Sequence, residues 1–184
     1  MDSKKRCKWC NLKNELYVEY HDHECGIPNF DDKYLYAMLL LESFQAGLSW
    51  ECVLNKRENF RKAYADFELE KVICFDENKV YELSNDKGII RNKRKINASI
   101  NNSRIFKAIV EEFGSFHNYL QTFTNGITIF ETGKTTNVLS DAISNDLKSR
   151  GMTFVGSVII YSYLQAIGVI YSHDEDCFLY KSGE

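Results

Sequence analysis

Cysteine and histidine residues gather in two parts of the sequence that lie far apart along the chain. The segments 7–10 (CKWC) and 20–26 (YHDHECG) stand near its beginning, and His173 is followed by Cys177 near its other end. Thiolate and imidazole groups are the ligands that structural zinc prefers, and four of them surround the ion in a tetrahedron. Four residues apart, His173 and Cys177 project from one helical face or close one turn. The pattern predicts a zinc site that ties the two ends together.

The spacing leaves the remaining two ligands open. Cys7 and His21 can supply them, but so can Cys10 in place of the first, and His23 or Cys25 in place of the second. A simpler interpretation is that these residues are buried thiols and surface histidines, the usual roles of single cysteines and histidines.

A carboxylate and several aromatic residues form a second constellation. Glu42 falls on the apolar side of a predicted helix, where a carboxylate must find donors or a positive partner. An N-methylated purine carries a positive charge, which attracts aromatic faces and complements a carboxylate. The set therefore suits a flipped, cationic nucleobase. Alternatively, the aromatic residues belong to the core and Glu42 binds a backbone amide or an arginine. The four aromatic residues are Trp9, Tyr17, Tyr20 and Trp50.

The segment 151–156 (GMTFVG) lies between two predicted helices and resembles a helix-hairpin-helix element. Its glycines let backbone N–H groups approach a phosphate, and the following helix N-terminus adds its dipole. Lys148 and Arg150 precede the turn and would supplement this contact. An ordinary turn between two helices is the competing interpretation.

The charge balance gives only local support to a nucleic-acid partner. The net charge is −3, which argues mildly against DNA binding. Residues 87–95, however, hold five cations, and Arg104 and Lys107 continue the basic stripe. This stripe is either a positive surface for phosphates or a solvated helix face.

Helical spacing of apolar residues recurs along the chain and predicts one all-α domain over residues 1–184. No secretory signal is recognisable, and the longest apolar stretch, 155–170, is interrupted by polar residues and too short for a bilayer. We therefore expect a cytoplasmic protein without a membrane partner, in which cysteines are core thiols or metal ligands. The predicted helices start at Asp31-Asp32, after Ser49 and at Asp76 or Glu77, and span about 91–113, 140–150 and 157–167, whereas 124–137 is expected to be a loop.

Several strings, taken in order, cover about residues 6 to 178. They are Arg6-Cys7-x-Trp9, Tyr17-x-x-Tyr20-His21-Asp22-x-Glu24, Leu41-Glu42-x-x-Gln45-Ala46-Gly47-Leu48-Ser49-Trp50, Lys56-Arg57-Glu58-Asn59, Gly88-Ile89-Ile90-Arg91 with Lys95 and Ile96, Phe154-Val155-Gly156 and His173-x3-Cys177. Together they resemble the family of 3-methyladenine DNA glycosylase I (TAG). The run from Glu42 to Trp50 is the most specific of these matches.

The resemblance implies a helix-hairpin-helix DNA glycosylase fold in which one structural zinc ties the N- and C-terminal segments together, with the hairpin near 148–160. It implies the zinc ligands Cys7, His21, His173 and Cys177. It implies Glu42 as the catalytic residue of a base pocket whose other members are Tyr20, Trp50, Tyr17 and Trp9. The expected DNA contacts are Leu48, as a wedge into the gap left by the flipped nucleotide, and Gly151, Gly156, Lys148 and Arg150.

Three features depart from the family pattern. Cys25 stands where the family usually carries tryptophan, so one pocket wall is expected to be smaller or differently shaped. Cys10 is an additional thiol, either a competitor for the metal or without a role. Residues 157–159 are less polar than the family's usual threonines, which bears on the phosphate contacts.

The implied activity is hydrolysis of the N-glycosidic bond of 3-methyladenine in double-stranded alkylated DNA, with the free base as product. The charged base is already a good leaving group, so selective binding matters more than acid–base help. No lysine occurs between Gly151 and Tyr180, which predicts a monofunctional glycosylase without strand cleavage. A monomer is the simplest expectation.

Two other functions compete with this one. The pairs His21-Asp22 and His173-Asp174 are typical of a class of metal-dependent phosphohydrolases, although cysteine ligands argue against a catalytic metal there. A zinc protein that binds DNA without catalysis is the other alternative, but it has no need of Glu42 among aromatic residues. Release of free 3-methyladenine separates both from the glycosylase.

Overall fold

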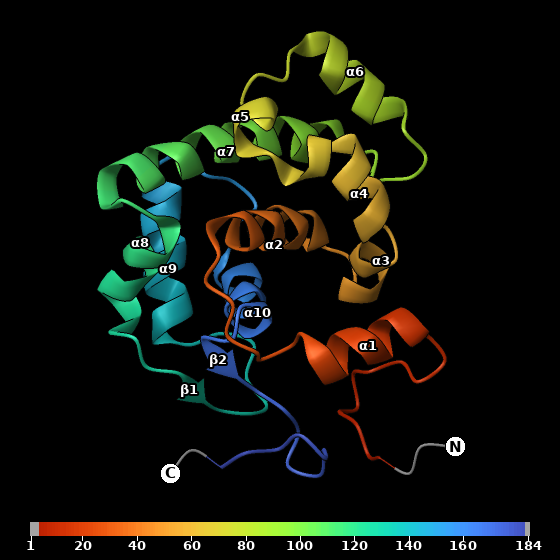
Figure 1. The fold of residues 1–184 in the computed structure, drawn as a ribbon, viewed down its shortest axis with the longest axis vertical. Helices are drawn as coiled ribbons and strands as arrows, with labels where there is room; N and C mark the ends of the chain where they lie inside the picture. Colours follow the sequence, from red (N-terminus) through yellow and green to blue (C-terminus); the bar gives the residue numbers. More distant parts are fainter. Residues whose placement is uncertain (1–3, 183–184) are drawn as a thin grey trace.

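The computed structural model describes residues 4–182 and is built mainly from α-helices (Figure 1). The helices are α1 (Glu15–His23), α2 (Asp32–Gln45), α3 (Trp50–Leu54), α4 (Arg57–Ala63), α5 (Leu69–Val72), α6 (Glu77–Asn85), α7 (Lys93–Phe113), α8 (Phe116–Thr124), α9 (Val138–Ser149) and α10 (Ser157–Ala166), with a short turn η1 (Ala65–Phe67). Two short strands, β1 (Ile129–Phe130) and β2 (Ile170–Tyr171), pair in parallel. The helical class is confirmed. None of the helices described is long and apolar enough to cross a membrane.

Three predicted helix starts are confirmed by their caps. The side chains of Asp31, Ser49 and Asp76 each accept a hydrogen bond from the backbone N–H three residues later. Such a bond satisfies one of the N–H groups that a helix start leaves without an intrahelical partner. The long helix α7 begins two residues later than predicted, because the Asn92 side chain accepts from the N–H groups of Arg94 and Lys95.

The sequence pattern missed α1, α4, α5 and α8, and the predicted loop 124–137 contains β1. Helix α1 buries Tyr17, Tyr20 and His21 rather than aliphatic residues, so it lacks an obvious apolar stripe. Strand β1 pairs with residues about 40 positions away, with Ile129 opposite Ile170. Neither feature leaves a strong local signal, because both depend on contacts made elsewhere in the fold.

Helix α2 runs through the middle of the molecule and contacts α3, α7, α8 and α10 (Figure 1). Nine of its 14 residues are buried, and they occupy all sides of the helix. A helix that is apolar all round belongs in a core. Its position matters because Glu42 lies on it, so surrounding helices fix the backbone that carries this carboxyl.

The predicted basic stripe needs a correction. Lys95 is buried, and its ammonium donates to the carbonyls of Phe44 and Ala46 at 2.8 and 2.6 Å. It thereby satisfies carbonyl groups that the C-terminus of α2 leaves without intrahelical donors. Arg104 likewise donates to the Ile73 carbonyl, and Lys107 pairs with a glutamate of α5. Lys95 is therefore a structural cation and Lys107 is paired with a carboxylate, whereas Arg104 stays on the surface.

Gly168 allows the segment after α1 to pack closely against the end of α10. It has a φ of +77°, and a Cβ at this position would lie 2.3 Å from the backbone nitrogen of Pro28. Only glycine permits so close an approach of two backbones. Around this contact Gly26 N–H donates to the Gln165 carbonyl and Asn29 N–H to the Ile167 carbonyl. The segment after α1 is therefore held against the end of α10.

Candidate active site and metal centre

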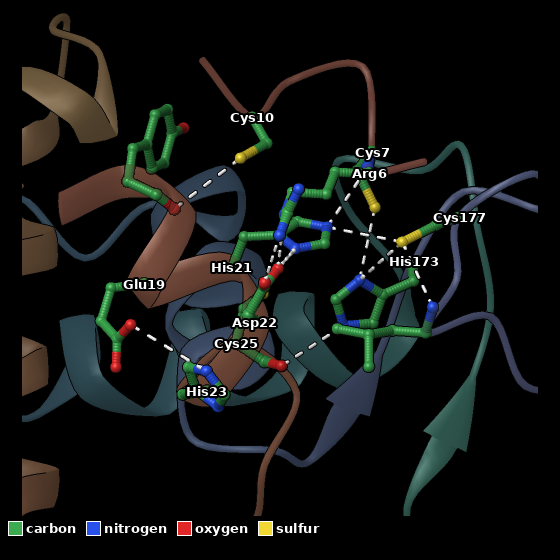
Figure 2. A network of polar contacts seen from close by, with 12 residues as sticks. Arg6, Cys7, Cys10, Glu19, His21, Asp22, His23, Cys25, His173 and Cys177 are labelled. Carbon is green, nitrogen blue, oxygen red and sulfur yellow. Dashed lines mark hydrogen bonds and ion pairs between the residues drawn. The ribbon is translucent and has the colours of Figure 1, made fainter. Parts of the chain in front are cut away.

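Cys7, His21, His173 and Cys177 converge in one buried cluster (Figure 2). One ligand atom from each lies within 4.8 Å of the others, and each residue is at most 6% exposed. The first two come from the N-terminal segment and α1. The other two come from the chain after β2, where a turn with Cys177 N–H bonded to the Asp174 carbonyl brings them to the same side.

The donor set and its spacing fit zinc. Bond lengths of about 2.3 Å to sulfur and about 2.05 Å to nitrogen, at tetrahedral angles, put the two kinds of ligand atom about 3.6 Å apart. The Cys7 sulfur lies 3.3 Å from Nδ1 of His173. The Cys177 sulfur lies 3.5 Å from Nε2 of His21 and 3.8 Å from Nδ1 of His173. The four residues could therefore hold one metal ion, and the spacing of their ligand atoms fits zinc.

The outer nitrogens of both imidazoles are held by further groups. His21 Nδ1 lies 2.8 Å from Asp22, whose carboxylate also receives two hydrogen bonds from Arg6 at 2.8 and 2.7 Å. Hydrogen bonds from Arg6, followed by the one from His21, lower the pKa of Asp22 to about 2. His173 Nε2 lies 3.3 Å from the Cys25 carbonyl. Such partners fix the orientation and tautomer of a metal-binding histidine.

The structure also shows which nearby groups stay outside the cluster. The Cys10 sulfur contacts the Tyr17 carbonyl, His23 is 66% exposed beside Glu19, and Cys25 reaches the cluster only through its carbonyl (Figure 2).

The phosphohydrolase interpretation is contradicted by the two aspartates, because neither is among the four clustered residues. Asp22 is engaged by Arg6 and His21, as above, and Asp174 accepts a hydrogen bond from the Lys8 N–H at 2.7 Å. The His-Asp pairs therefore do not present a carboxylate and imidazole set to one ion.

Beside the cluster lies a cavity of about 280 Å³ between α1, α2, α3 and α10. The five residues predicted for the base pocket all line it: Trp9, Tyr17, Tyr20, Glu42 and Trp50. Cys25 also lines it, at the wall for which the sequence predicted a change. The sequence missed the remaining lining residues, which are Gln45, Lys134, Ser162 and Gln165.

Helix α1 links the cavity to the cluster. Tyr20 and His21 follow Tyr17 by three and four residues, so all three side chains lie on one side of the helix. The Trp9 ring lies 5.4 Å from that of Tyr17 and 5.0 Å from that of His21, measured between centroids. The Tyr20 ring lies 6.4 Å from that of Tyr17 and 5.4 Å from that of Trp50. The cluster therefore holds the helix and the tryptophan that form one aromatic wall.

Three buried polar atoms of the cavity lining have no partner within the described part of the chain. They are Oε2 of Glu42, Oε1 of Gln45 and Nε1 of Trp50. Buried polar groups are almost always hydrogen-bonded, so three in one cavity mark the place of a polar ligand. Burial raises the pKa of Glu42 well above its usual value. A cationic guest would supply the positive charge that the ionised carboxylate lacks.

The turn 150–156 joins α9 to α10 as the helix-hairpin-helix prediction requires. Gly151 has a φ of +99°, and Gly156 occupies the N-cap of α10 with open space at its Cβ position. The Asn102 side chain accepts from the N–H of Thr153 at 3.0 Å and donates to its carbonyl at 2.8 Å. The turn is thus fixed against α7 with the N-terminus of α10 open to an anion.

The other predicted DNA contacts lie on the surface in different situations. Leu48 is 44% exposed in the turn between α2 and α3, and Lys148 is exposed in the last turn of α9. Arg150 instead pairs with Glu112 and Asp146 at 2.6 and 2.8 Å. Its guanidinium is therefore already balanced by two carboxylates.

The missed lining residues differ in how far the sequence could have indicated them. Gln45 follows Glu42 by three residues in the most specific string, so the sequence could have predicted that it lies beside Glu42 on α2. Ser162 and Gln165 lie one turn apart on α10, and no sequence motif around them indicates a binding site. Lys134 belongs to the loop between β1 and α9, whose path depends on the pairing of β1 with β2.

A helical fold that joins a hairpin between two helices to an aromatic cavity with an unpartnered carboxyl is that of a DNA glycosylase. A crystal structure of 3-methyladenine DNA glycosylase I superposes with a TM-score of 0.91 at 37% identity, covering 96% of this chain and all of the other. A second structure is of a tyrosine-to-phenylalanine variant of that enzyme in complex with 3-methyladenine. It gives a TM-score of 0.86 at 33% identity, over 91% of this chain and 93% of the other.

The chain belongs to the methyladenine glycosylase family, whose model matches residues 9–180. DNA-3-methyladenine glycosylase 1 of Escherichia coli (strain K12) is 41% identical over 186 residues. The match covers 97% of this chain and 98% of the relative.

Proposed function

We propose that this chain excises 3-methyladenine from alkylated DNA as the first step of base excision repair. The observation that carries the proposal is the cavity in which Glu42, Gln45 and Trp50 present unpartnered polar atoms beside aromatic rings. An adenine methylated at N3 is flat and positively charged, and it has ring and amino nitrogens that need partners. Relatives that span nearly the whole chain carry the same activity in their names.

In this proposal the cavity selects the leaving group. The flipped base lies against a row of aromatic rings formed by Trp9, Tyr17, Tyr20 and Trp50, and Glu42 complements its positive charge. Water attacks C1′ of the deoxyribose while the bond from C1′ to the base nitrogen breaks, and the attacking water releases one proton to the solvent. The electron pair of that bond neutralises the cationic base, which therefore leaves easily. Preferential binding of the charged base then supplies selectivity.

In this proposal, residues outside the cavity lining hold the DNA. Leu48 enters the gap that the flipped nucleotide leaves in a double-stranded substrate. The backbone N–H groups around Gly151 and Gly156, together with Lys148, receive the phosphates. Arg150 was predicted as a further contact. Its two carboxylate partners give it a mainly structural role in fixing the hairpin, with a smaller contribution to phosphate binding.

We further propose that the cluster of Cys7, His21, His173 and Cys177 holds one structural zinc ion. When bound, the ion would cross-link the N-terminal and C-terminal segments and would take no part in the reaction. Four protein ligands leave no open position for water or substrate, which is the arrangement of structural sites.

The enzyme is proposed to be monofunctional, with residues 1–184 acting as one glycosylase domain. A strand-cleaving glycosylase needs a neutral amine to attack the sugar carbon. The lysine that lines the cavity, Lys134, is instead paired with the Glu131 carboxylate at 2.6 Å.

The direct test measures base release from methylated DNA by the purified protein, with 3-methyladenine resolved from 7-methylguanine. Release of 3-methyladenine without 7-methylguanine and without strand breaks is expected. Release of neither base, from folded protein that binds DNA, would contradict the proposal and favour a non-catalytic DNA-binding role.

A further inference from the structure

Lys134 is the one cationic side chain among the described residues that line the cavity. Its side chain is 55% exposed, whereas Glu42, the carboxyl in the same lining, is 2% exposed. The two charged groups therefore stand at opposite depths: the carboxyl at the buried end and the ammonium at the mouth.

A mostly buried carboxylate holds Lys134 at this place. The Glu131 side chain is 11% exposed and accepts from Lys134 Nζ at 2.6 Å and from Asn137 Nδ2 at 2.6 Å. Its backbone N–H continues the sheet by donating to the Tyr171 carbonyl. The loop is thus anchored on both sides of Lys134, by β1 before it and by the N-cap of α9 after it. An ammonium has three donors, so two remain available after the bond to Glu131.

A cation in this lining repels the positive charge that an N3-methylated adenine carries while it is attached to its sugar. The repulsion between like charges is smallest when the ammonium lies at the mouth, away from the end that carries Glu42. A nucleotide flipped into the cavity, however, brings its own phosphates to the mouth, since the backbone must remain outside while the base enters. At that position a cation finds an anionic partner that the free base lacks.

We propose that Lys134 binds a phosphate adjoining the flipped nucleotide and so acts as a substrate-positioning residue at the cavity mouth. This inference rests on the proposed function. It assigns the two ends of the cavity to the two charges of one substrate: Glu42 to the cationic base and Lys134 to the anionic backbone. The residue therefore favours a lesion within DNA over the same base free in solution.

The experiment compares Lys134→Gln with the wild-type protein on two probes. The first probe is a duplex carrying a single tetrahydrofuran abasic site, which retains the flanking phosphates but has no base. The second is free 3-methyladenine. Lys62→Gln removes an exposed cation of α4 and serves as the matched control, and Lys134→Arg keeps the charge at the mouth.

We expect Lys134→Gln to weaken binding of the abasic duplex about five-fold at low salt, the order expected for one partly exposed charged contact. Loss of one phosphate contact should also reduce the slope of log Kd against log salt by about 0.9. The affinity for free 3-methyladenine, which is neutral and has no phosphate, should stay the same. Lys134→Arg should retain most of the duplex affinity, and Lys62→Gln should match the wild-type protein.

An unchanged duplex affinity and salt slope in Lys134→Gln would overturn the inference. Equal weakening toward the duplex and the free base would also overturn it, because Lys134 would then contact the base. Failure of the wild-type protein to release 3-methyladenine from methylated DNA would instead remove the proposed function, and the phosphate assignment with it. The excision assay on the wild-type protein therefore distinguishes the two failures.

Discussion

The cysteine–histidine cluster and the cavity lie side by side and share helix α1, yet their polar groups are in opposite states. In the cluster, each imidazole has its outer nitrogen held by Asp22 or the Cys25 carbonyl, and both sulfurs accept backbone N–H groups. In the cavity, three buried polar atoms have no protein partner among the described residues.

The contrast separates a structural site from a binding site. Polar groups that find all their partners in one another and in a single bound ion need no further ligand. A buried set left unsatisfied costs stability unless a ligand completes it, so it is expected where function requires it. The same aromatic helix serves both, because His21 fixes it and Tyr17 and Tyr20 use its position.

The largest effect is expected from removing one corner of the cluster. Cys177→Ala should abolish stoichiometric zinc binding and lower the free energy of unfolding by about 3 kcal/mol or more, because metal binding is coupled to folding. Metal analysis and thermal unfolding measure these effects. The matched control is Cys10→Ala, which removes a buried thiol from the same segment but outside the cluster and should keep the metal. Equal zinc content in the two variants would contradict the assignment.

Removing the carboxyl of the cavity should reduce activity and leave the metal content unchanged. Glu42→Ala is expected to reduce excision of 3-methyladenine by about 100-fold, comparable to loss of one preorganised electrostatic contact. Its zinc content should equal that of the wild-type protein. Single-turnover excision and metal analysis on one preparation give both values. Full activity in this variant would remove Glu42 from the pocket, whereas loss of zinc would show that the two regions are not separable.

The smallest effect concerns the pH dependence of stability. Burial raises the pKa of Glu42 above its usual 4.5, so the folded protein binds this proton more tightly than the unfolded chain does. The stability associated with the neutral carboxyl is complete below pH 4.5 and is lost as the pH rises through the raised pKa. Glu42→Gln carries no charge and should escape this loss.

The stability of Glu42→Gln relative to wild type should therefore increase with pH, measured by urea unfolding from pH 4.5 to 8.5. Glu77→Gln, an exposed substitution on α6, provides the control curve. A constant difference between Glu42→Gln and wild type across this range would mean that burial does not hold the carboxyl neutral.

Sequence alone recovered those parts of the site that local chemistry determines. Glu42 was recognisable because a carboxylate on the apolar side of a helix needs a reason to be there. Spacing narrowed the candidates for the four residues of the cluster but did not choose among them. His21 and His23 are separated by about 200° around a helix, so only one can face inward, and the resemblance rather than the spacing indicated which.

The remaining features depend on distant parts of the fold. Lys95 looked like one cation of a basic stripe, but the carbonyls that it caps belong to a helix about 50 residues earlier. Lys134 reaches the cavity because β1 pairs with β2, and no local pattern encodes that pairing. Both residues show why charge along a sequence is a poor guide to charge on a surface.

The division of the cluster between two ends of the chain also sets an order of events during synthesis. Cys7 leaves the ribosome 166 residues before His173, so an N-terminal thiol and imidazole exist for most of translation without their partners. A metal ion captured at that stage would have half a coordination shell. Final assembly must therefore wait until the helices between them have formed and carried the ends together. A metal ion bound by all four residues would therefore require the intervening chain to have reached its native arrangement.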